Sequence, residues 1–202
     1  MHGEGDVAFF DRVARLYDRL APATDPEPIW AGLARADRPV TRVLDLAGGT
    51  GRGARAVTES AAAAGLGSVD AVVVDASRAM LRRAAARGVA SVQGDAGRLP
   101  LRDGAVDAVV LLDAFHHLPD PEAALEETAR VLRPGGVLVI REFDPGTLRG
   151  RLLAASERAV GFESTFRRPE TTATAVDSAG LDATVLDRGF AYTVLGTKRG
   201  SH

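Results

Sequence analysis

The sequence contains no cysteine, and Lys198 is the one lysine among its 25 basic residues. The absence of cysteine excludes disulfides, thiolate zinc sites, iron–sulfur clusters and a cysteine nucleophile. The single lysine leaves almost no room for a mechanism that uses a lysine base or a Schiff base. The chemistry of this chain must therefore rest on other side chains or on a bound cofactor.

Positive charge is not in excess either. Lysine and arginine number 25 against 27 aspartate and glutamate residues, which gives a formal net charge of −2, and neither half of the chain is strongly basic. Proteins that bind nucleic acid rely on clustered positive charge to neutralise phosphates. We therefore expect no nucleic-acid partner.

Long apolar runs are also missing, because the longest ones are strand-sized and are interrupted by residues such as Asp107 and Asp113. A helix that spans a bilayer needs about 20 predominantly apolar residues. The first eleven residues include Glu4, Asp6 and Asp11 and lack the basic n-region that opens a secretory signal. These features predict a cytoplasmic protein with no membrane span.

What the chain does contain is the composition of an ordinary globular domain, with 202 residues of which 46% are hydrophobic. From about residue 41 onward, helical patterns alternate with apolar runs that predict strands at 43–46, 71–75, 89–93, 106–112, 137–140, 183–186 and 191–197. Repeated strand–helix–strand units imply a parallel sheet with helices on both faces. Residues 187–189 predict a tight hairpin between the last two strands. The expected fold is α/β, a three-layer sandwich around a seven-stranded, mostly parallel sheet that ends in an antiparallel hairpin.

The chain before residue 41 has a different pattern. Its first 20 residues form an amphipathic pattern with Phe9, Val13, Leu16 and Leu20 at helical spacing, and residues 21–40 contain four prolines. We therefore expect a helical lid and linker over residues 1–40 and one compact domain over residues 41–202.

The ends of the predicted strands indicate where a ligand binds, because ligands of open α/β sheets sit beyond the carboxyl ends of the strands. The first strand leads into Asp45-Leu46-Ala47-Gly48-Gly49-Thr50-Gly51, where the glycines permit a sharp turn and a close approach of the ligand. Asp75, Asp95 and Asp113 follow the next three strands. Each feature alone also fits a tight turn or a helix cap, but their joint placement favours a ligand that carries a ribose and an adenine.

These residues resemble the class I S-adenosylmethionine-dependent methyltransferases. The resemblance rests on five segments in the family's order, namely Val43–Gly51, Val74–Ser77 with Met80-Leu81, Gly94–Ala96, Leu99–Val109 and Leu118–Gly136. It spans about residues 40–145 and is closest to the small-molecule branch that includes the ubiquinone and menaquinone biosynthesis C-methyltransferases. Phe9–Ala14 with Tyr17-Asp18 is similar to the N-terminal helix of that branch.

The resemblance implies a Rossmann-like fold, S-adenosylmethionine as cofactor, S-adenosylhomocysteine as product, a small organic acceptor, and a monomer or homodimer. In the family's pattern Asp75 would hold the ribose hydroxyls, Asp95 the adenine amine, and Tyr17 would close over the cofactor. The full set of implied cofactor contacts is Tyr17, Asp45, Ala47, Gly49, Thr50, Gly51, Asp75, Ala76, Asp95, Ala96, Asp113 and Ala114.

Two departures from the family's pattern bear on function. Ala47 replaces the usual first glycine, which still allows a close approach. The segment Asp113-Ala114-Phe115-His116-His117 differs from that of the quinone enzymes, so the acceptor stays open. His116 and His117 are candidate general bases, because an imidazole titrates near pH 6.5. The alternative is that one of them packs beneath the following helix.

No metal site is expected, because adjacent histidines in one loop seldom present both rings to one ion and no third ligand is evident. Glu142 and Asp144 border the expected acceptor side, where a solvated loop is favoured over substrate contact. The arginines between residues 149 and 168 predict a solvated helix face, with contact to an anionic substrate as the alternative.

Two other functions stay open. Gly49-x-Gly51-x-x-Ala54 also fits the fingerprint of an NAD(P)-dependent oxidoreductase. Neither Tyr17 nor Tyr192 stands four residues before Lys198, however, as the tyrosine–lysine pair of a short-chain dehydrogenase requires. A non-catalytic protein that binds the cofactor or a partner is the second alternative.

Overall fold

The computed structural model describes residues 25–63, 68–162 and 164–200. Seven strands form a single sheet in the order β3-β2-β1-β4-β5-β7-β6. The strands are β1 (Arg42–Leu46), β2 (Asp70–Asp75), β3 (Ala90–Gln93), β4 (Val106–Leu112), β5 (Leu132–Phe143), β6 (Asp182–Asp187) and β7 (Ala191–Thr197). The first five are parallel, whereas β7 runs antiparallel to both β5 and β6. The predicted seven-stranded, mostly parallel sheet with an antiparallel hairpin at its end is confirmed.

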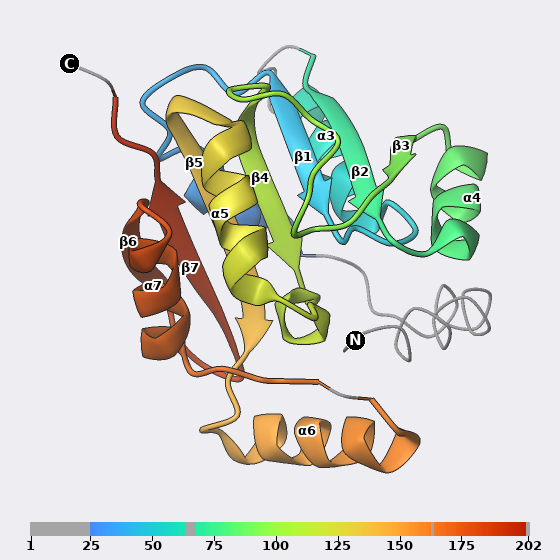
Figure 1. Cartoon of the computed structure of the whole chain (residues 1–202), viewed down its shortest axis with the longest axis vertical. Helices are drawn as coiled ribbons and strands as arrows, with labels where there is room; N and C mark the ends of the chain where they lie inside the picture. Colours follow the sequence, from blue (N-terminus) through green and yellow to red (C-terminus); the bar gives the residue numbers. More distant parts are fainter. Residues whose placement is uncertain (1–24, 64–67, 163, 201–202) are drawn as a thin grey trace.

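Helices cover both faces of the sheet and produce the predicted three layers (Figure 1). The helical elements are α2 (Glu27–Leu33), α3 (Arg52–Ala63), α4 (Arg78–Ala86), the short 3₁₀ helix η1 (Phe115–His117), α5 (Pro121–Val131), α6 (Leu148–Val160) and α7 (Pro169–Ser178). Apolar side chains of α5 and α7 join one core cluster, and those of α2 and α3 join the other. Helix α6 lies beyond the ends of β4 and β5 (Figure 1).

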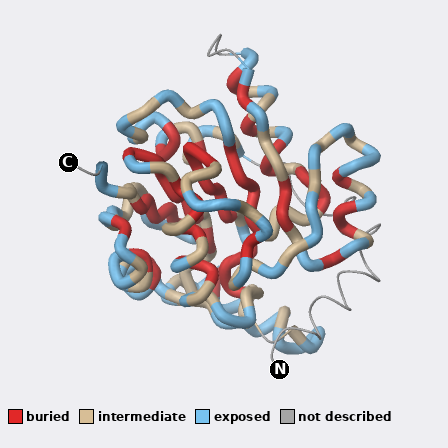
Figure 2. The backbone as a smooth tube through the Cα atoms, turned by 45° about the horizontal axis from the view of Figure 1, so that its top comes forward, coloured by how far each residue is buried: buried red, intermediate tan, exposed pale blue. Residues whose placement is uncertain are grey.

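The central strands are apolar on both faces, as expected for parallel strands between two helical layers. In β5, Leu138 and Ile140 face the α5 and α7 side, while Val137 and Val139 face the α2 and α3 side. All four are completely buried, and the buried residues concentrate in the middle of the molecule (Figure 2). The core thus fixes the sheet, and the sheet fixes where its carboxyl edge lies.

Local chemistry explains where two of the helices begin. The hydroxyl of Ser77 accepts a hydrogen bond from the amide of Met80 and caps α4. Pro121 stands at the start of α5, and the buried face of this helix contains Ala124 and Leu125.

Other elements differ from the predictions. Helix α2 lies in what the sequence suggested was a linker, yet Ile29 and Leu33 are buried in the core. Helix α7 lies in a segment for which no element was predicted, whereas α6 overlaps the predicted solvated helix face of residues 149–168. Strand β5 runs from Leu132 to Phe143 and is therefore longer at both ends than the strand predicted at 137–140. Gly135 has φ of 76°, and its amide donates to the carbonyl of Lys198, which ties this stretch to the residue that follows β7.

The division of the chain at residue 40 stays a prediction. Residues 1–24, with the expected amphipathic helix and Tyr17, lie outside the described residues. Within the described part of the chain, no helix is long and apolar enough to cross a membrane.

Lys198 has a structural position that fits its exclusion from catalysis. Its ammonium donates to the carbonyl oxygens of Ala129 and Leu132, at 2.6 and 2.7 Å. These carbonyls belong to the C-terminal end of α5, where a helix leaves its last carbonyls unpaired and favours a cation. The single lysine therefore caps a helix.

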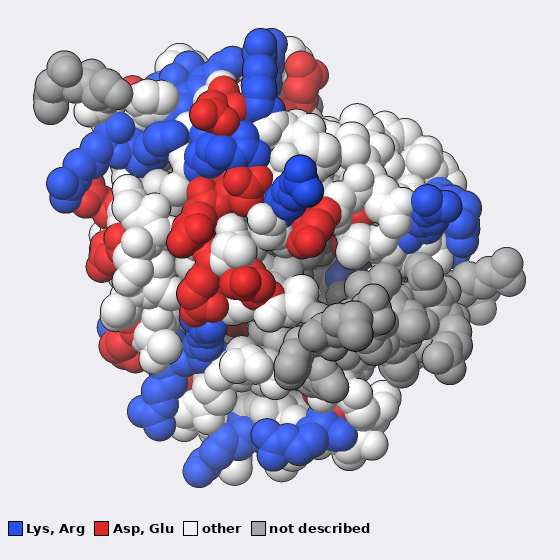
Figure 3. Space-filling model, viewed as in Figure 1, with Lys and Arg blue, Asp and Glu red and all other residues white. Residues whose placement is uncertain are grey.

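Charged side chains of both signs are mixed on the face seen in Figure 3. Acidic residues gather over α5, where Glu122 and Glu126 are exposed, and basic residues gather along α6, where Arg149 and Arg151 are exposed. The expectation of no nucleic-acid partner stays a prediction.

Candidate functional site

The carboxyl edge of the sheet is distorted at its centre, where β1 and β4 lie side by side. After β1 the chain adds β2 and β3 on one side, and after β4 it adds β5 on the other side. The boundary between β1 and β4 is therefore the switch point, where α/β sheets bind ligands. Ala47 follows β1 and Asp113 follows β4, with φ of 53° and 52°. Among the described residues they are the only non-glycine residues with positive φ. Such backbone strain concentrates at functional sites.

The turn after β1 is held by hydrogen bonds on both sides. The Ala47 amide donates to the carbonyl of Val74, and the Gly51 amide donates to the carbonyl of Gly48. Gly49 has φ of +55°, and a Cβ there would come no closer than 4.0 Å to Asp75 and Met80. The turn is therefore tight in its backbone while its outer side leaves space next to Asp75.

Asp75 ties the ends of β1 and β2 together. One carboxylate oxygen accepts from the Gly49 amide at 2.9 Å, and the other accepts from the Ser77 amide at 2.8 Å. The side chain is only half-buried. A carboxylate has further lone pairs, so these two bonds leave it able to accept from a ligand's hydroxyl groups.

Asp45 lies beneath the turn and is buried. Its Oδ2 accepts from the Ala54 amide at 2.8 Å, whereas its Oδ1 has no hydrogen-bond partner among the described residues. Burial raises the pKa of this carboxyl to about 7. The hydrogen bond from Ala54 lowers the pKa, and the negative charge of nearby Asp75 raises it further. The two roles expected for this residue, orienting the loop and binding an amino group, fit its bonded Oδ2 and its unpaired Oδ1 respectively.

Asp95 reaches the same edge through the pairing of β2 with β3. The Gly94 amide donates to the carbonyl of Asp75, and Asp95 is exposed with Oδ1 accepting from the Gly97 amide at 2.9 Å. Ala96, which lies between Asp95 and Gly97, is half-buried. The predicted acids of three successive strands therefore do line one edge.

The remaining predicted contacts differ in accessibility. The Thr50 side chain is buried, and its carbonyl accepts from Arg87 at 2.8 Å. Ala76 is exposed, and its carbonyl accepts from Gln93 at 3.0 Å. Ala114 is buried directly before η1. The partners Arg87 and Gln93 were missed, because nothing in the local pattern marks which distant side chain supports a loop.

Next to this edge, η1 places His116 and His117 against α6. His116 is buried, and its Nδ1 lies 2.7 Å from Oε2 of Glu142. The same oxygen accepts from the His116 backbone amide at 3.1 Å. Glu142 is completely buried near the end of β5, so the solvated-loop interpretation of this residue is wrong.

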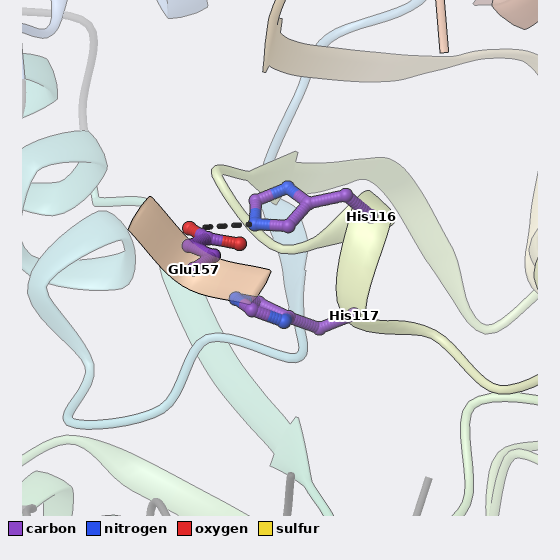
Figure 4. A group of neighbouring side chains, drawn as sticks. All are labelled: His116, His117 and Glu157. Carbon is purple, nitrogen blue, oxygen red and sulfur yellow. Dashed lines mark ion pairs between the residues drawn. The ribbon is translucent and has the colours of Figure 1, made fainter. Parts of the chain in front are cut away.

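Glu157 approaches the histidines from α6, as Figure 4 shows. Its Oε1 lies 3.7 Å from Nε2 of His116, and its Oε2 accepts from the Ser164 hydroxyl at 2.5 Å. The Ser164 oxygen lies 3.3 Å from Nδ1 of His117, which is half-buried. Glu157 thus supplies the third group that was not evident from the sequence, and the expectation of no metal site stays a prediction.

Neighbouring carboxylates shift the pKa values of His116 and Asp113. Burial lowers the pKa of His116, but Glu142 and Glu157 outweigh it and raise the pKa to about 9. Desolvation by the surrounding protein and, after it, the negative charge of Glu142 raise the pKa of the exposed Asp113 to about 6. Glu157 has a lowered pKa because its interaction with the His116 ring and the hydrogen bond from Ser164 outweigh its burial. The edge therefore holds concentrated negative charge.

The described residues fit a ligand with a cationic end and vicinal hydroxyl groups. An unpaired carboxylate oxygen of Asp45 suits a cation, and the half-buried Asp75 suits paired hydroxyls. The histidines and Glu157 lie beside this position, where a second reactant would meet it. Tyr17, expected to close over the ligand, lies outside the described residues.

Comparison with protein families identifies a match over residues 44–140 to the model described as "Methyltransferase domain". A demethylmenaquinone methyltransferase of Mycolicibacterium vanbaalenii is 39% identical over 146 residues, which cover 70% of this chain and 61% of that protein. The chain therefore spans about three-fifths of the length of the curated relatives it matches.

Solved structures share the fold across nearly the whole chain. A Thermotoga maritima S-adenosylmethionine-dependent methyltransferase, described as a possible histamine N-methyltransferase, matches with a TM-score of 0.75 at 23% identity and covers 95% of this chain and 99% of its own. The [4+2]-cyclase SpnF matches with a TM-score of 0.74 at 16% identity over 99% and 97%. Because a cyclase shares it, this fold does not fix the reaction.

Proposed function

We propose that this protein, whose residues 44–140 match the methyltransferase domain family, is an S-adenosylmethionine-dependent methyltransferase that acts on a small organic acceptor. When bound, S-adenosylmethionine supplies a methyl group on a positively charged sulfur, with S-adenosylhomocysteine as the product. The work left to the chain is to hold the two reactants in line and to exclude water. Positioning of this kind accounts for about 7–11 kcal/mol of barrier lowering in favourable cases.

The observation that carries the proposal is the position of Asp75. Its carboxylate accepts a hydrogen bond from the amide of Gly49, which has a left-handed backbone conformation. The same carboxylate lies at the open side of the turn. A side chain that only capped a helix would not need to bridge two strand ends. We assign it the ribose hydroxyls of the cofactor.

The other contacts follow from the same edge. Asp45 orients the turn and faces the amino group of the methionine part, while Asp95 and the Ala96 amide take the adenine. The backbone of Ala47, Gly49, Thr50 and Gly51, together with Asp113 and Ala114, would hold the methionine part, and Ala76 would contact the ribose. The role of Tyr17 as a cofactor contact stays a prediction.

The acceptor lies on the side of η1 and α6. Demethylmenaquinone methyltransferases are similar to this chain, so reduced demethylmenaquinone is the first acceptor to assay. A non-catalytic binding protein and an NAD(P)-dependent oxidoreductase are the alternatives that the following experiment separates.

The test is calorimetric titration with S-adenosylmethionine, S-adenosylhomocysteine and NADH, with a thermal melt of each mixture. We expect both sulfur nucleosides to bind and to raise the melting temperature, because a ligand at 100 times its dissociation constant adds about 2.7 kcal/mol of stability. NADH should do neither. Binding of NADH in their place, or no binding of either nucleoside, would overturn the proposal.

We further propose that His117 removes a proton from the acceptor, with His116 as its positioning neighbour. His116 is buried against two carboxylates, whereas His117 is half-buried and more accessible. His117→Ala should therefore lower turnover with reduced demethylmenaquinone by about 10²–10⁴-fold and leave the affinity for S-adenosylmethionine unchanged. His117→Gln, which keeps a polar side chain, should be equally slow. Recovery of turnover in His117→Gln would return this residue to a structural role.

A further inference from the structure

We infer that His116, His117 and Glu157 form a binding site for a divalent transition-metal ion beside the proposed cofactor site. One atom from each side chain lies within 4.8 Å of the other two. Ligands bound to zinc at about 2.0–2.2 Å stand about 3–3.6 Å apart. The His116 Nε2 to Glu157 Oε1 distance of 3.7 Å is already near that range, so only small side-chain movements are needed.

The turn geometry explains how two adjacent histidines serve one site. Residues 115–117 form the 3₁₀ helix η1, and the His116 and His117 ring centroids lie 4.0 Å apart at 47°. Figure 4 shows both rings beside the Glu157 carboxylate, which arrives from a different element. The site is therefore built by tertiary contact and not by spacing along the chain.

His116 is held in the orientation that a metal ligand requires. Its Nδ1 pairs with the buried Glu142 at 2.7 Å, which places the proton on Nδ1 in the neutral ring and leaves the lone pair on Nε2. This is the carboxylate–histidine arrangement that orients histidine ligands in metal sites. Nε2 is buried and has no hydrogen-bond partner among the described residues. Phe166 stacks on the ring at 4.2 Å and fixes its plane.

Ser164 supports the other two groups. Its hydroxyl donates to Glu157 Oε2, so toward Nδ1 of His117 it can only accept. Acceptance from Nδ1 places the proton of a neutral His117 on that nitrogen, as in His116. The two rings thus share one tautomer, and Glu157 Oε1 is the carboxylate oxygen that faces them.

Charge and ligand type indicate which ion fits. Glu142 and Glu157 bring two carboxylates to a buried imidazole, and a divalent cation balances them. Two imidazoles with one carboxylate suit Zn²⁺ or Fe²⁺ and leave coordination positions open. On the premise of the proposed function, these positions would take an oxygen of the methyl acceptor, and with the ion bound His117 would serve as its ligand in place of removing the proton. Such a site favours acceptors with a hydroxyl or an enolisable carbonyl.

The experiment is titration of the full chain with Zn²⁺ by calorimetry, with visible absorption of the Co²⁺ complex as a second readout. His2→Gln and His202→Gln are introduced first, because these are the other two histidines of the sequence. We expect one Zn²⁺ per chain. Glu157→Gln, which keeps an oxygen for Ser164, should weaken Zn²⁺ binding by about 100-fold or more, because even loss of a supporting outer-shell group costs about 10–100-fold.

Glu126→Gln on the exposed face of α5 is the matched control and should bind Zn²⁺ like the parent chain. His117→Gln removes a ligand from η1 and decides the matter if Glu157→Gln fails to fold in a thermal melt. Absence of one-equivalent binding, or equal Zn²⁺ affinity in Glu157→Gln and Glu126→Gln, would overturn the site. A chain that binds S-adenosylmethionine but not Zn²⁺ loses this inference alone, and a chain that binds only Zn²⁺ loses the proposed function alone.

Discussion

Replacing Asp107 with alanine is expected to lower the free energy of unfolding by about 3–5 kcal/mol, the range for removing one partner of a buried ion pair. Asp107 is buried in β4 at the amino-terminal edge of the sheet. Its Oδ2 accepts from the Thr41 amide, the Thr41 hydroxyl and the Arg42 amide at 2.9–3.0 Å. Its Oδ1 pairs with Arg38 and Arg133, each at 2.9 Å. One carboxylate thus joins the starts of β1, β4 and β5.

The matched control is Asp103→Ala. Asp103 pairs with Arg130 at 2.7 Å, but its side chain is 82% exposed. An exposed pair of this kind contributes about 0–1 kcal/mol. Chemical denaturation of both variants measures the difference. A loss for Asp107→Ala no larger than that for Asp103→Ala would contradict the structural role assigned to Asp107.

The lowered pKa of Asp107 predicts that the free energy of unfolding depends on pH. Burial opposes ionisation of Asp107, but hydrogen bonds from Thr41, Arg133 and Arg42 outweigh it and lower its pKa to about 2. Because the folded pKa lies below the unfolded value near 3.9, its contribution is present above pH 4 and is lost as pH falls toward 2. Asp107→Asn should be less stable near pH 7 and should lose less stability between pH 4 and 2.

The largest expected effect on ligand binding is that of Asp75→Ala, which should weaken the affinity for S-adenosylmethionine by more than about tenfold, or about 1.4 kcal/mol. Hydrogen bonds to a charged group contribute about 1.5–3 kcal/mol each, and the ribose offers two hydroxyls. Loss of the Gly49 contact would loosen the turn as well. Both effects act in the same direction.

Asp70→Ala controls for this variant, because Asp70 is exposed at the opposite end of the same strand. Calorimetric titration should show an unchanged affinity for Asp70→Ala. Asp75→Asn separates the two contributions, since an amide oxygen can still accept from Gly49 but carries no charge. Unchanged affinity in Asp75→Ala would refute the placement of the ribose.

The separation of these two effects follows from the architecture. Asp107 lies at the amino edge of the sheet and Asp75 at the carboxyl edge, and the completely buried strand interiors stand between them. Asp107→Ala should therefore leave the affinity for S-adenosylmethionine of the folded protein unchanged.

The sequence by itself determined the fold and the edge of the sheet at which the cofactor site is proposed. Strand-sized apolar runs such as Val106–Leu112 and the glycine turn after Leu46 are local patterns, and they specify a parallel sheet and its carboxyl edge without reference to distant residues. Helix α2 escaped prediction because seven residues among prolines carry little periodicity. Helix α6, which has a single buried residue, was expected only as a solvated helix face, and α7 escaped although Pro169 marks its start.

Only the tertiary structure decided how the acceptor side is built. Glu142 reads as a loop residue in the sequence, yet the pairing of β5 with β4 and β7 buries it beside His116. Glu157 reads as one charge on a solvated helix, yet the chain that follows α6 returns to η1 through the bond from the Thr165 amide to the His116 carbonyl. Local periodicity reports which side of an element is apolar. It does not report which distant polar side chains meet, because that depends on how whole elements pack.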